Sequence, residues 1–195
     1  MTKQQVLEEA LNLFAHHGYE NTSLAHIAKA VGIKKPSLYN HFSNKEAIFF
    51  EVLDEVVKRQ IQFFEQKGSE LNQDSIEDQL HDFYDIYLDY MTTSTEGMFF
   101  KRVTFFPPEN FSDEIKKAFL RVEDTLTNSL IPVFEKGIEE GKLRKLPVPM
   151  LTSAFYTLID GLFLEENFYD TDILNERKKA SWEIFWLGIR HPEEA

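Results

Sequence analysis

Residues 18–48 read GYENTSLAHIAKAVGIKKPSLYNHFSNKEAI, and this stretch decides the fold. Apolar residues recur at helical spacing from Leu24 to Val31. Thr22-Ser23 precedes this run as an N-cap signal, and Gly32 follows it as a C-terminal signal. The first part of the stretch therefore predicts a short helix that ends in a glycine turn.

Two further helix starts follow in the same stretch. Pro36 suits the first turn of a short helix, because its missing N–H has no intrahelical partner there. Ser43 and Glu46 have the spacing of a capping box, which predicts a longer helix over residues 44–66. The stretch therefore predicts two short helices that are joined by a glycine turn. A third, longer helix follows them and has its own N-terminal cap.

The helix that begins at Pro36 has one apolar and one polar side. At 100° per residue, Leu38 and Phe42 fall close together and are expected to be buried. Asn40 lies opposite them, and Tyr39 and His41 lie on the two flanks. The same geometry places Pro36 and Ser37 beside Asn40, while the pair Lys34-Lys35 lies at the N-terminus of the helix.

A helix that lies in a DNA major groove has this distribution of side chains. Short polar groups face the base edges and larger donors face the phosphates on either side, and Asn pairs bidentately with adenine. Base contacts concentrate at the N-terminal end of such a helix, where Lys34 and Lys35 lie. The alternative is a three-helix packing unit whose polar face is merely solvated.

The remainder of the chain has helical periodicity nearly throughout, with a break expected at residues 68–74. An N-terminal helix carries Val6, Leu7, Ala10, Leu11 and Phe14 on one side and is expected to end at Gly18. Later helices are expected over residues 75–91, 96–106, 113–140 (bent at Pro132), 147–169 and 175–190. The chain is therefore expected to be all-α, with about nine helices.

Composition limits the classes of protein. The 195 residues carry a net charge of −12 and contain no Cys, which excludes disulfides, thiolate zinc sites and cysteine nucleophiles. Residues 1–50 carry five Lys and four Glu, so their charge is +1 and that of residues 51–195 is −13. The charged N-terminal pattern is unlike a signal peptide, and no apolar run reaches the roughly 20 residues of a membrane span. A cytoplasmic protein without a membrane partner is expected.

The N-terminal residues resemble the DNA-binding region of the tetracycline-repressor (TetR) family. The resemblance covers residues 3–50 without a gap and is carried by Thr22-Ser23-Leu24, Ile27-Ala28, Val31-Gly32-Ile33, Ser37 to Phe42 and Lys45-Glu46. It implies a three-helix helix-turn-helix DNA-binding domain at residues 1–50 and a helical effector-binding and dimerisation domain at residues 51–195. It also implies a homodimeric, ligand-responsive regulator, in most cases a repressor released from a palindromic operator by a small effector.

The resemblance assigns roles to ten positions. Thr22 and Ser23 correspond to phosphate contacts. The groove-facing positions are Lys34, Lys35, Pro36, Ser37 and Asn40, and the phosphate-clamping positions are Tyr39, His41 and Lys45. Base-contacting positions vary within the family, so no operator sequence follows.

Aromatic residues are concentrated in the second part of the chain, where fourteen of the eighteen Phe follow residue 50. Most of them are expected in a core, but the family keeps a ligand cavity between these helices, and such a lining suits a partly aromatic or apolar effector. Candidate effector-binding residues are Phe83, Tyr84, Tyr87, Phe99, Phe105, Phe134, Tyr156, Asp160 and Phe163. Among them Asp160 has the most specific expected role, because a carboxylate amid aromatic rings suits a cationic or hydroxylated ligand. Alternatively, it pairs with Arg121 or with a base of a partner subunit.

The last expected helix is apolar on more than one side, which predicts a homodimer. The resemblance to the TetR family implies that the last two helices of each subunit form a four-helix interface. Its candidate residues are Phe155, Leu158, Leu162, Trp182, Phe185, Trp186 and Ile189.

The sequence contains no motif for catalysis. It lacks HExxH and a glycine-rich phosphate loop, so we expect no enzyme activity, no cofactor and no metal. The remaining alternative is a helical ligand-binding or protein-interaction dimer that does not bind DNA.

Overall fold

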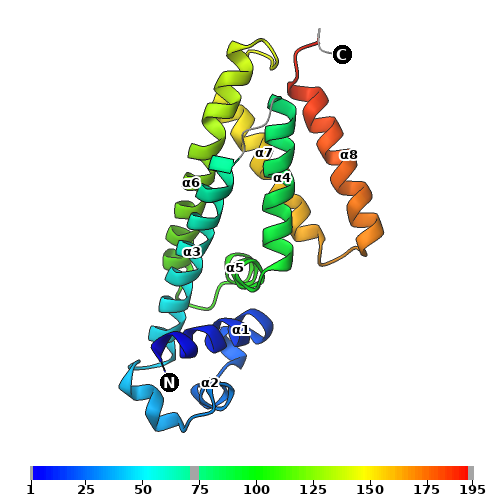
Figure 1. Cartoon of the computed structure of the whole chain (residues 1–195). Helices are drawn as coiled ribbons and strands as arrows, with labels where there is room; N and C mark the ends of the chain where they lie inside the picture. The colour runs from blue at the N-terminus through cyan, green and yellow to red at the C-terminus, as the bar shows by residue number, and fades with distance from the viewer. Residues whose placement is uncertain (1, 71–74, 193–195) are drawn as a thin grey trace. The chain divides into compact units, whose positions relative to one another are not determined.

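The computed structural model describes residues 2–70 and 75–192, which are helical almost throughout (Figure 1). In chain order the elements are α1 (Lys3–Asn21), α2 (Leu24–Val31), the 3₁₀ helix η1 (Lys35–Asn40), α3 (Lys45–Glu70), α4 (Ile76–Thr93), α5 (Thr95–Phe105), α6 (Ser112–Glu139), α7 (Val148–Glu165) and α8 (Thr171–Ile189). These nine helices of the described residues confirm the all-α prediction.

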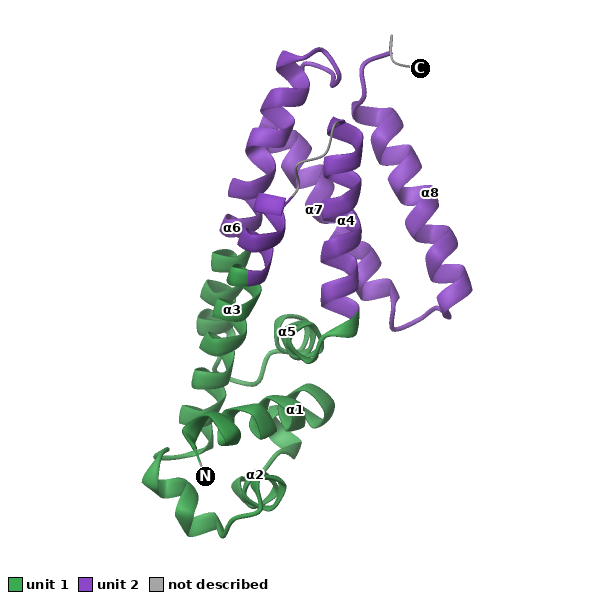
Figure 2. Ribbon diagram, in the orientation of Figure 1, with its two compact units in different colours: residues 1–62, 93–122 green, residues 63–92, 123–195 purple. Residues whose placement is uncertain are grey.

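The chain divides into two compact units, coloured separately in Figure 2. Unit 1 comprises residues 1–62 and 93–122, and unit 2 comprises residues 63–92 and 123–195. Both α3 and α6 contribute residues to each unit, whereas α1, α2 and η1 belong to unit 1 and α7 and α8 belong to unit 2.

The predicted turns of the first fifty residues are present. Gly18 has φ 79° and ψ 167° and interrupts α1, so residues 19–21 form a separate final turn. Gly32 follows α2 in the left-handed conformation at φ 77° and donates its N–H to the carbonyls of Ala28 and Lys29. Both positions favour glycine, because positive φ is strained for residues with a Cβ.

Several predicted boundaries differ from the observed ones. The cap of α3 is Asn44, whose Oδ1 accepts the N–H of Ala47 at 2.7 Å, and not Ser43. Asp170 caps α8 through the N–H of Ile173, so this helix begins at Thr171, and α7 ends at Glu165. Asx side chains cap helices as well as Ser does, so the sequence signal did not separate Asn44 from the neighbouring Ser43.

Another difference concerns the expected break at residues 68–74. Residues 68–70 belong to α3, and residues 71–74 lie outside the described residues. Gly68 lies inside α3, and its φ is not positive. A glycine is therefore no reliable helix end without a positive φ.

Each unit has its own aromatic core. In unit 1, Phe49 contacts Phe14, Tyr19, Phe99 and Phe111 at ring-centroid distances of 5.0–5.8 Å. In unit 2, the fully buried Phe155 contacts Phe83, Tyr84, Phe134 and Phe185. These ring clusters hold the helices that carry the polar groups described below.

Candidate nucleic-acid interface

The helix η1 is held to unit 1 by two apolar side chains. Leu38 and Phe42 are 1% and 4% exposed, whereas Lys34, Lys35, Pro36, Tyr39, Asn40 and His41 are exposed and Ser37 is half-buried. The separation that the sequence predicted between a buried and a polar side is therefore present. Tyr39, with 53% of its surface accessible, is the most prominent aromatic side chain of this helix.

The predicted helix is 3₁₀ and not α. Lys34 precedes it without a side-chain cap, and the Ser37 N–H donates to the Lys34 carbonyl at 2.9 Å. Short, poorly capped segments adopt 3₁₀ geometry readily. With three residues per turn, Ser37 and Asn40 lie on one line, and Pro36 and Tyr39 lie on the next. The α-helical wheel placed the polar residues on the correct side of the helix. It did not predict which of them align along the helix axis, because the turn contains three residues and not 3.6.

Ser23 begins α2 through reciprocal capping with His26. Its Oγ accepts the His26 N–H at 3.1 Å, and its own N–H donates to His26 Nδ1 at 3.3 Å. Ser23 is exposed, so its hydroxyl proton remains available to an acceptor such as a phosphate. The role of His26 was not predicted, because the capping-box pattern expects Glu or Gln at this position.

Thr22 has a different environment. It is 1% exposed, and its Oγ1 donates to the carbonyls of Gly18 and Leu13 at 2.8 and 3.3 Å. The hydroxyl closes the final turn of α1 and is covered by its own chain. Thr22 therefore positions Ser23, and a direct phosphate contact by its hydroxyl does not fit this geometry.

Lys45 lies at the start of α3 and is half-buried. Its Nζ donates to the Tyr19 carbonyl at 2.8 Å and lies 3.9 Å from the centre of the Tyr19 ring. The ring and the carbonyl orient the ammonium group, and its remaining donor capacity is available to an anion.

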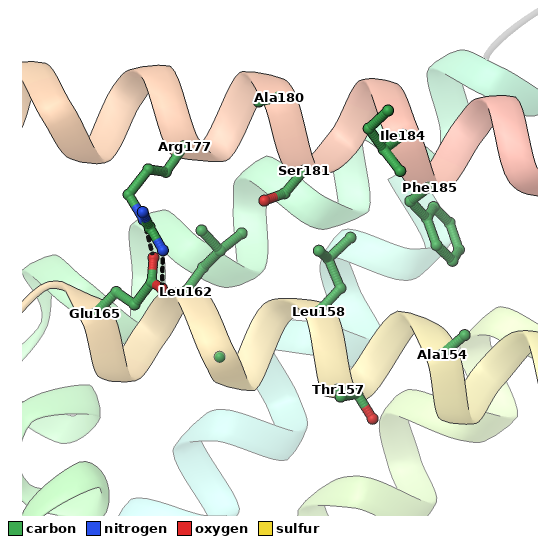
Figure 3. A pocket seen from close by; sticks show the side chains of 11 residues that line it. Ala154, Thr157, Leu158, Leu162, Glu165, Arg177, Ala180, Ser181, Ile184 and Phe185 are labelled. Carbon is green, nitrogen blue, oxygen red and sulfur yellow. Dashed lines mark hydrogen bonds and ion pairs between the residues drawn. The ribbon is translucent and has the colours of Figure 1, made fainter.

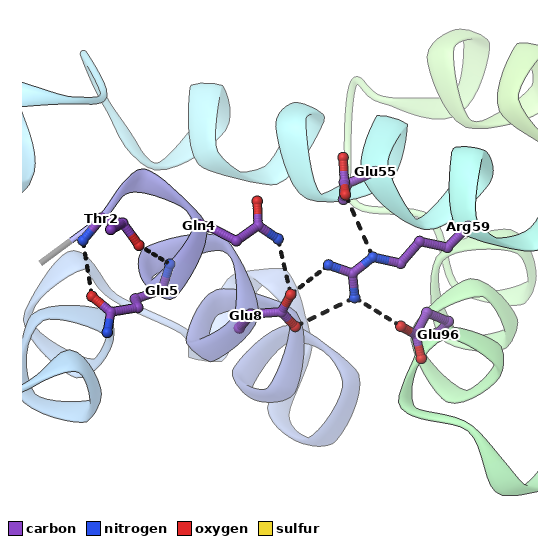
Figure 4. A network of polar contacts seen from close by, with 7 residues as sticks. All are labelled: Thr2, Gln4, Gln5, Glu8, Glu55, Arg59 and Glu96. Carbon is purple, nitrogen blue, oxygen red and sulfur yellow. Dashed lines mark hydrogen bonds and ion pairs between the residues drawn. The ribbon is translucent and has the colours of Figure 1, made fainter.

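Unit 1 also contains an ion-pair network that the sequence did not reveal (Figure 4). Arg59 on α3 pairs with Glu8 on α1, with Glu96 on α5 at 3.0 Å and with Glu55 on its own helix. The Arg59 guanidinium lowers the pKa of the Glu8 carboxyl. Only the Glu55–Arg59 spacing of one helical turn was visible in the sequence. The network connects α1 to α3 and α5.

A second arginine closes the interrupted end of α1. The Nε and Nη2 of Arg102 on α5 donate to the carbonyls of Ala15 and His16 at 2.9 and 3.1 Å. Because Gly18 interrupts the helix, these carbonyls need donors from outside it. Arg102 supplies them from α5.

The candidate effector residues are divided between the units. Phe99 and Phe105 belong to unit 1, where Phe99 is buried and Phe105 is exposed. The others belong to unit 2, where all are buried except the partly buried Tyr156 and Asp160: Phe83, Tyr84, Tyr87, Phe134, Tyr156, Asp160 and Phe163. Most of the predicted aromatic set therefore belongs to the unit 2 core.

Tyr87, Tyr156 and Asp160 carry the polar groups of this set. Tyr87 Oη donates to Asp160 Oδ1 at 3.0 Å, joining α4 to α7. Tyr156 Oη accepts from Thr127 at 3.0 Å and donates to the Glu123 carbonyl on α6. Burial raises the pKa of the Asp160 carboxyl, and burial also raises the pKa of both phenols. The expected alternative partner of Asp160, Arg121, pairs instead with Asp54 in unit 1.

The predicted dimer residues differ in accessibility. Phe155, Leu162, Trp182 and Ile189 are buried within the chain, while Leu158, Phe185 and Trp186 are half-buried. The large exposed apolar side chains of α8 are instead Ile184 at 72%, Leu187 at 48% and Ile173 at 44%. The sequence identified an apolar helix but did not separate the side that contacts its own core from the exposed side.

An open groove of about 660 Å³ runs between α7 and α8 (Figure 3). Small residues line much of it, including Ala154, Gly161, Ala180 and Ser181, together with the exposed Ile184. The ion pair between Glu165 and Arg177 lies at one end.

Within residues 2–70 and 75–192, no helix is both long and apolar enough to cross a membrane.

Comparison with known proteins agrees with this geometry. The model of the family described as bacterial regulatory proteins, tetR family, matches residues 6–52. The biofilm operon icaADBC negative transcriptional regulator IcaR of Staphylococcus aureus (strain Newman) is 31% identical over 171 residues, covering 84% of this chain and 80% of that protein. The transcriptional repressor ComR of Escherichia coli (strain K12) is 47% identical over 57 residues, which are 29% of this chain and 27% of ComR.

Solved structures share the fold. A transcriptional regulator from Saccharomonospora viridis, in complex with choline, superposes with a TM-score of 0.77 at 19% identity and covers 96% of this chain and 97% of that one. FadR from Bacillus subtilis, in complex with stearoyl-CoA, has a TM-score of 0.71 at 19% identity and covers 96% and 100%. The chain belongs to the TetR family and is a transcriptional regulator.

Proposed function

We propose that this protein is a repressor that binds operator DNA through η1 and releases it when a small effector binds unit 2. The observation that carries the DNA-binding part is the row of exposed polar residues Tyr39, Asn40 and His41 above the buried Leu38 and Phe42. Repressor function is supported by the names of the relatives IcaR and ComR. We propose residues 1–50 as the DNA-binding domain and residues 51–195 as the effector-binding and dimerisation domain.

The proposed contacts divide into two kinds. Asn40, Ser37 and the Lys34-Lys35 pair approach base edges with Pro36 beside them, because they occupy the exposed side and the N-terminal end of η1. Ser23, Tyr39, His41 and Lys45 bind phosphates on either side. Thr22 acts by closing α1 and setting the position of Ser23.

A mobility-shift assay on DNA from upstream of the protein's own gene tests DNA binding. We expect a specific complex whose affinity falls steeply with salt concentration, because phosphate contacts release counterions. A protein that fails to shift this DNA at low salt, or that shifts it no better than unrelated DNA, contradicts the proposal and favours the ligand-binding dimer without DNA affinity.

The proposed effector site is centred on Asp160 and its phenol partner Tyr87. A partly buried carboxylate that joins two helices is a polar anchor within an otherwise aromatic region. The choline and stearoyl-CoA of the two structural neighbours support a ligand-binding second domain, although they belong to those proteins. Asp160→Asn is expected to weaken effector-dependent release of DNA while leaving effector-free DNA binding unchanged.

We propose a homodimer whose interface is the α7–α8 groove. Its small residues permit close approach of a partner helix, and Ile184 and Leu187 offer exposed apolar surface. A twofold dimer presents two copies of η1 and therefore suits a palindromic operator. The effector acts by population shift and must prefer the form whose two η1 helices do not match the half-site spacing.

A further inference from the structure

Asp160 is an unusual carboxylate in unit 2. It lies on α7, is partly buried, and accepts one hydrogen bond from Tyr87 Oη at 3.0 Å. No Lys, Arg or His of the described residues forms an ion pair with it, whereas the carboxylates of Glu8, Asp54 and Glu165 each have an arginine partner. A neutral phenol compensates a carboxylate less well than a cation does.

The groups around Asp160 make this region more negative. Burial raises the pKa of its carboxyl and the charge of Glu123 on α6 raises that pKa further, while the Tyr87 hydrogen bond on α4 lowers it. Asp124 on α6 acts on the neighbouring Tyr156 in the same direction as Glu123. The elements packed here therefore contribute carboxylates and phenols, and the groups that act on Asp160, Tyr87 and Tyr156 include no cation.

Two phenols neighbour the same carboxylate, Tyr87 through its hydrogen bond and Tyr156 through the charge that Asp160 exerts on it. Tyr87 stacks on the buried Phe64 of α3 with ring centroids 5.7 Å apart. Tyr156, one turn before Asp160 on α7, is tied to α6 by its hydroxyl. Ring faces attract organic cations through their quadrupole, and a carboxylate beside them adds the opposite charge.

We propose that the effector bound at this site is an organic cation, whose charge the Asp160 carboxylate neutralises and whose substituents pack on Tyr87 and Tyr156. This inference rests on the proposed effector site and adds the chemical class of its ligand. An anionic ligand would meet Asp160 and Glu123 without a compensating base. A neutral ligand would leave the carboxylate without its counter-charge.

The site is also expected to couple cation binding to proton release. The raised pKa means that Asp160 ionises at a higher pH than an exposed Asp does, and a bound cation favours the ionised form, so a cation that binds the protonated carboxyl releases one proton to solvent. Affinity for the cation therefore rises with pH until Asp160 is ionised in the free protein, and then levels off.

A matched pair of probes tests the charge alone. Phenyltrimethylammonium and tert-butylbenzene have the same shape, and only the first is charged. We expect isothermal titration of the full-length protein at neutral pH to give at least roughly tenfold tighter binding of the cation, from ion-pair and charge-assisted contacts. Equal or tighter binding of tert-butylbenzene, or binding of neither probe, overturns the cation assignment.

Three variants test whether Asp160 is responsible for the preference for the cation. Asp160→Asn keeps the shape and an acceptor for Tyr87, and is expected to remove most of the preference for the cation and its pH dependence. Glu77→Gln removes the same charge from the exposed side of α4 and is expected to retain both. Tyr87→Phe keeps the ring but removes the hydrogen bond that lowers the Asp160 pKa, so the rise in affinity should move to higher pH. Undiminished preference in Asp160→Asn refutes the proposal.

These experiments distinguish a failure of the cation assignment from a failure of the proposed repressor mechanism. If phenyltrimethylammonium binds through Asp160 but does not release DNA at saturation, the cation site stands and the release mechanism fails. If a neutral or anionic compound releases DNA and the cation does not bind, the cation assignment fails and the effector mechanism stands.

Discussion

Gly18 and Gly32 both have positive φ, but they occupy different backbone regions. Gly32, at φ 77° and ψ 32°, is left-handed helical, a region that other residues enter at moderate cost. Gly18, at φ 79° and ψ 167°, lies in a region that is essentially restricted to glycine. A Cβ at Gly32 would meet nothing within 4 Å, and one at Gly18 would lie an ordinary 3.5 Å from Arg102. Backbone strain, not space, therefore sets the cost at both positions.

The two alanine variants should consequently differ in stability. Gly32→Ala is expected to lower the free energy of unfolding by about 1 kcal/mol, from left-handed strain partly offset by a stiffer unfolded chain. Gly18→Ala is expected to lower it by about 2–3 kcal/mol, from the glycine-only conformation. Urea unfolding measures both, and an equal loss in the two variants would show that the ψ difference has no energetic consequence.

Tyr39 and Asn40 are adjacent, but their substitution by alanine is expected to change DNA binding in different ways. Tyr39→Ala removes a proposed phosphate contact and should weaken binding to all DNA sequences alike, with an unchanged slope of affinity against salt because the phenol carries no charge. Asn40→Ala removes a proposed base contact and should cost about 1–3 kcal/mol on the preferred operator while relaxing preference at one position. Competition binding over a randomised operator measures both. Unchanged affinity and preference in Asn40→Ala would remove Asn40 from the base-contacting set.

At the scale of elements, α1 is held to α5 by two arginines. Arg59 of α3 bridges Glu8 of α1 and Glu96 of α5, and Arg102 of α5 closes the end of α1 before Gly18. Arg59 is half-buried, so its partners are less screened by solvent than an exposed pair. These contacts make the position of α1, and of the DNA-binding helices attached to it, dependent on α3 and α5.

Loss of the Arg59 network should destabilise unit 1 more than loss of an exposed ion pair. Arg59→Gln is expected to cost about 1–2 kcal/mol, because Glu8 and Glu96 lose their shared partner. Arg121→Gln removes the pair with Asp54, whose side chains are about half exposed, and should cost less than about 0.5 kcal/mol. Urea unfolding of the two variants, with wild type as the reference, gives the comparison.

The difference between wild type and Arg59→Gln should depend on pH. Arg59 lowers the pKa of Glu8 below its ordinary 4.5, so the folded state binds this proton less readily than the unfolded state. The contribution is therefore complete above the unfolded pKa and is lost as pH falls through the lower folded value. A difference that stays constant from pH 7 to acid unfolding would assign the effect of the variant to packing of the arginine stem.

At the scale of the whole molecule, the proposed dimer depends on the α7–α8 groove. Gly161 lies in this groove, and a Cβ there would meet nothing within 4 Å of its own chain. Ile184 is 72% exposed, more than any other large apolar side chain of α8 among the described residues. Neither feature contributes to the core of a single chain, so both are available to a partner.

Substitutions in the groove should change the oligomeric state without unfolding the chain. Ile184→Glu is expected to convert the dimer to a monomer in sedimentation velocity, because it places a charge in an apolar interface. Leu120→Glu, at the exposed Leu120 of α6, is the matched control and should remain dimeric. Gly161→Ala should preserve or raise helix stability yet weaken the dimer. A monomeric wild type, or a dimeric Ile184→Glu variant, contradicts the interface.

The sequence by itself determined the helical class and the order of the first three helices. The periodic apolar residues, the Ser23 cap and Gly18 and Gly32 are local signals that act within a few residues, so they can be identified without tertiary contacts. The buried Leu38 and Phe42 below the exposed Tyr39, Asn40 and His41 follow from the same short-range periodicity.

Tertiary structure alone decided which side of each long helix is covered and which distant groups meet. Arg59 reaches Glu8 across 51 residues of chain and Tyr87 reaches Asp160 across 73, and no local spacing specifies such pairs. The same holds for Thr22, whose hydroxyl is covered by α1, and for Trp182 and Ile184, which lie two residues apart on α8 with one buried and one exposed. Periodicity identifies an apolar side, but only packing of the whole chain determines how much of that side its own core can cover.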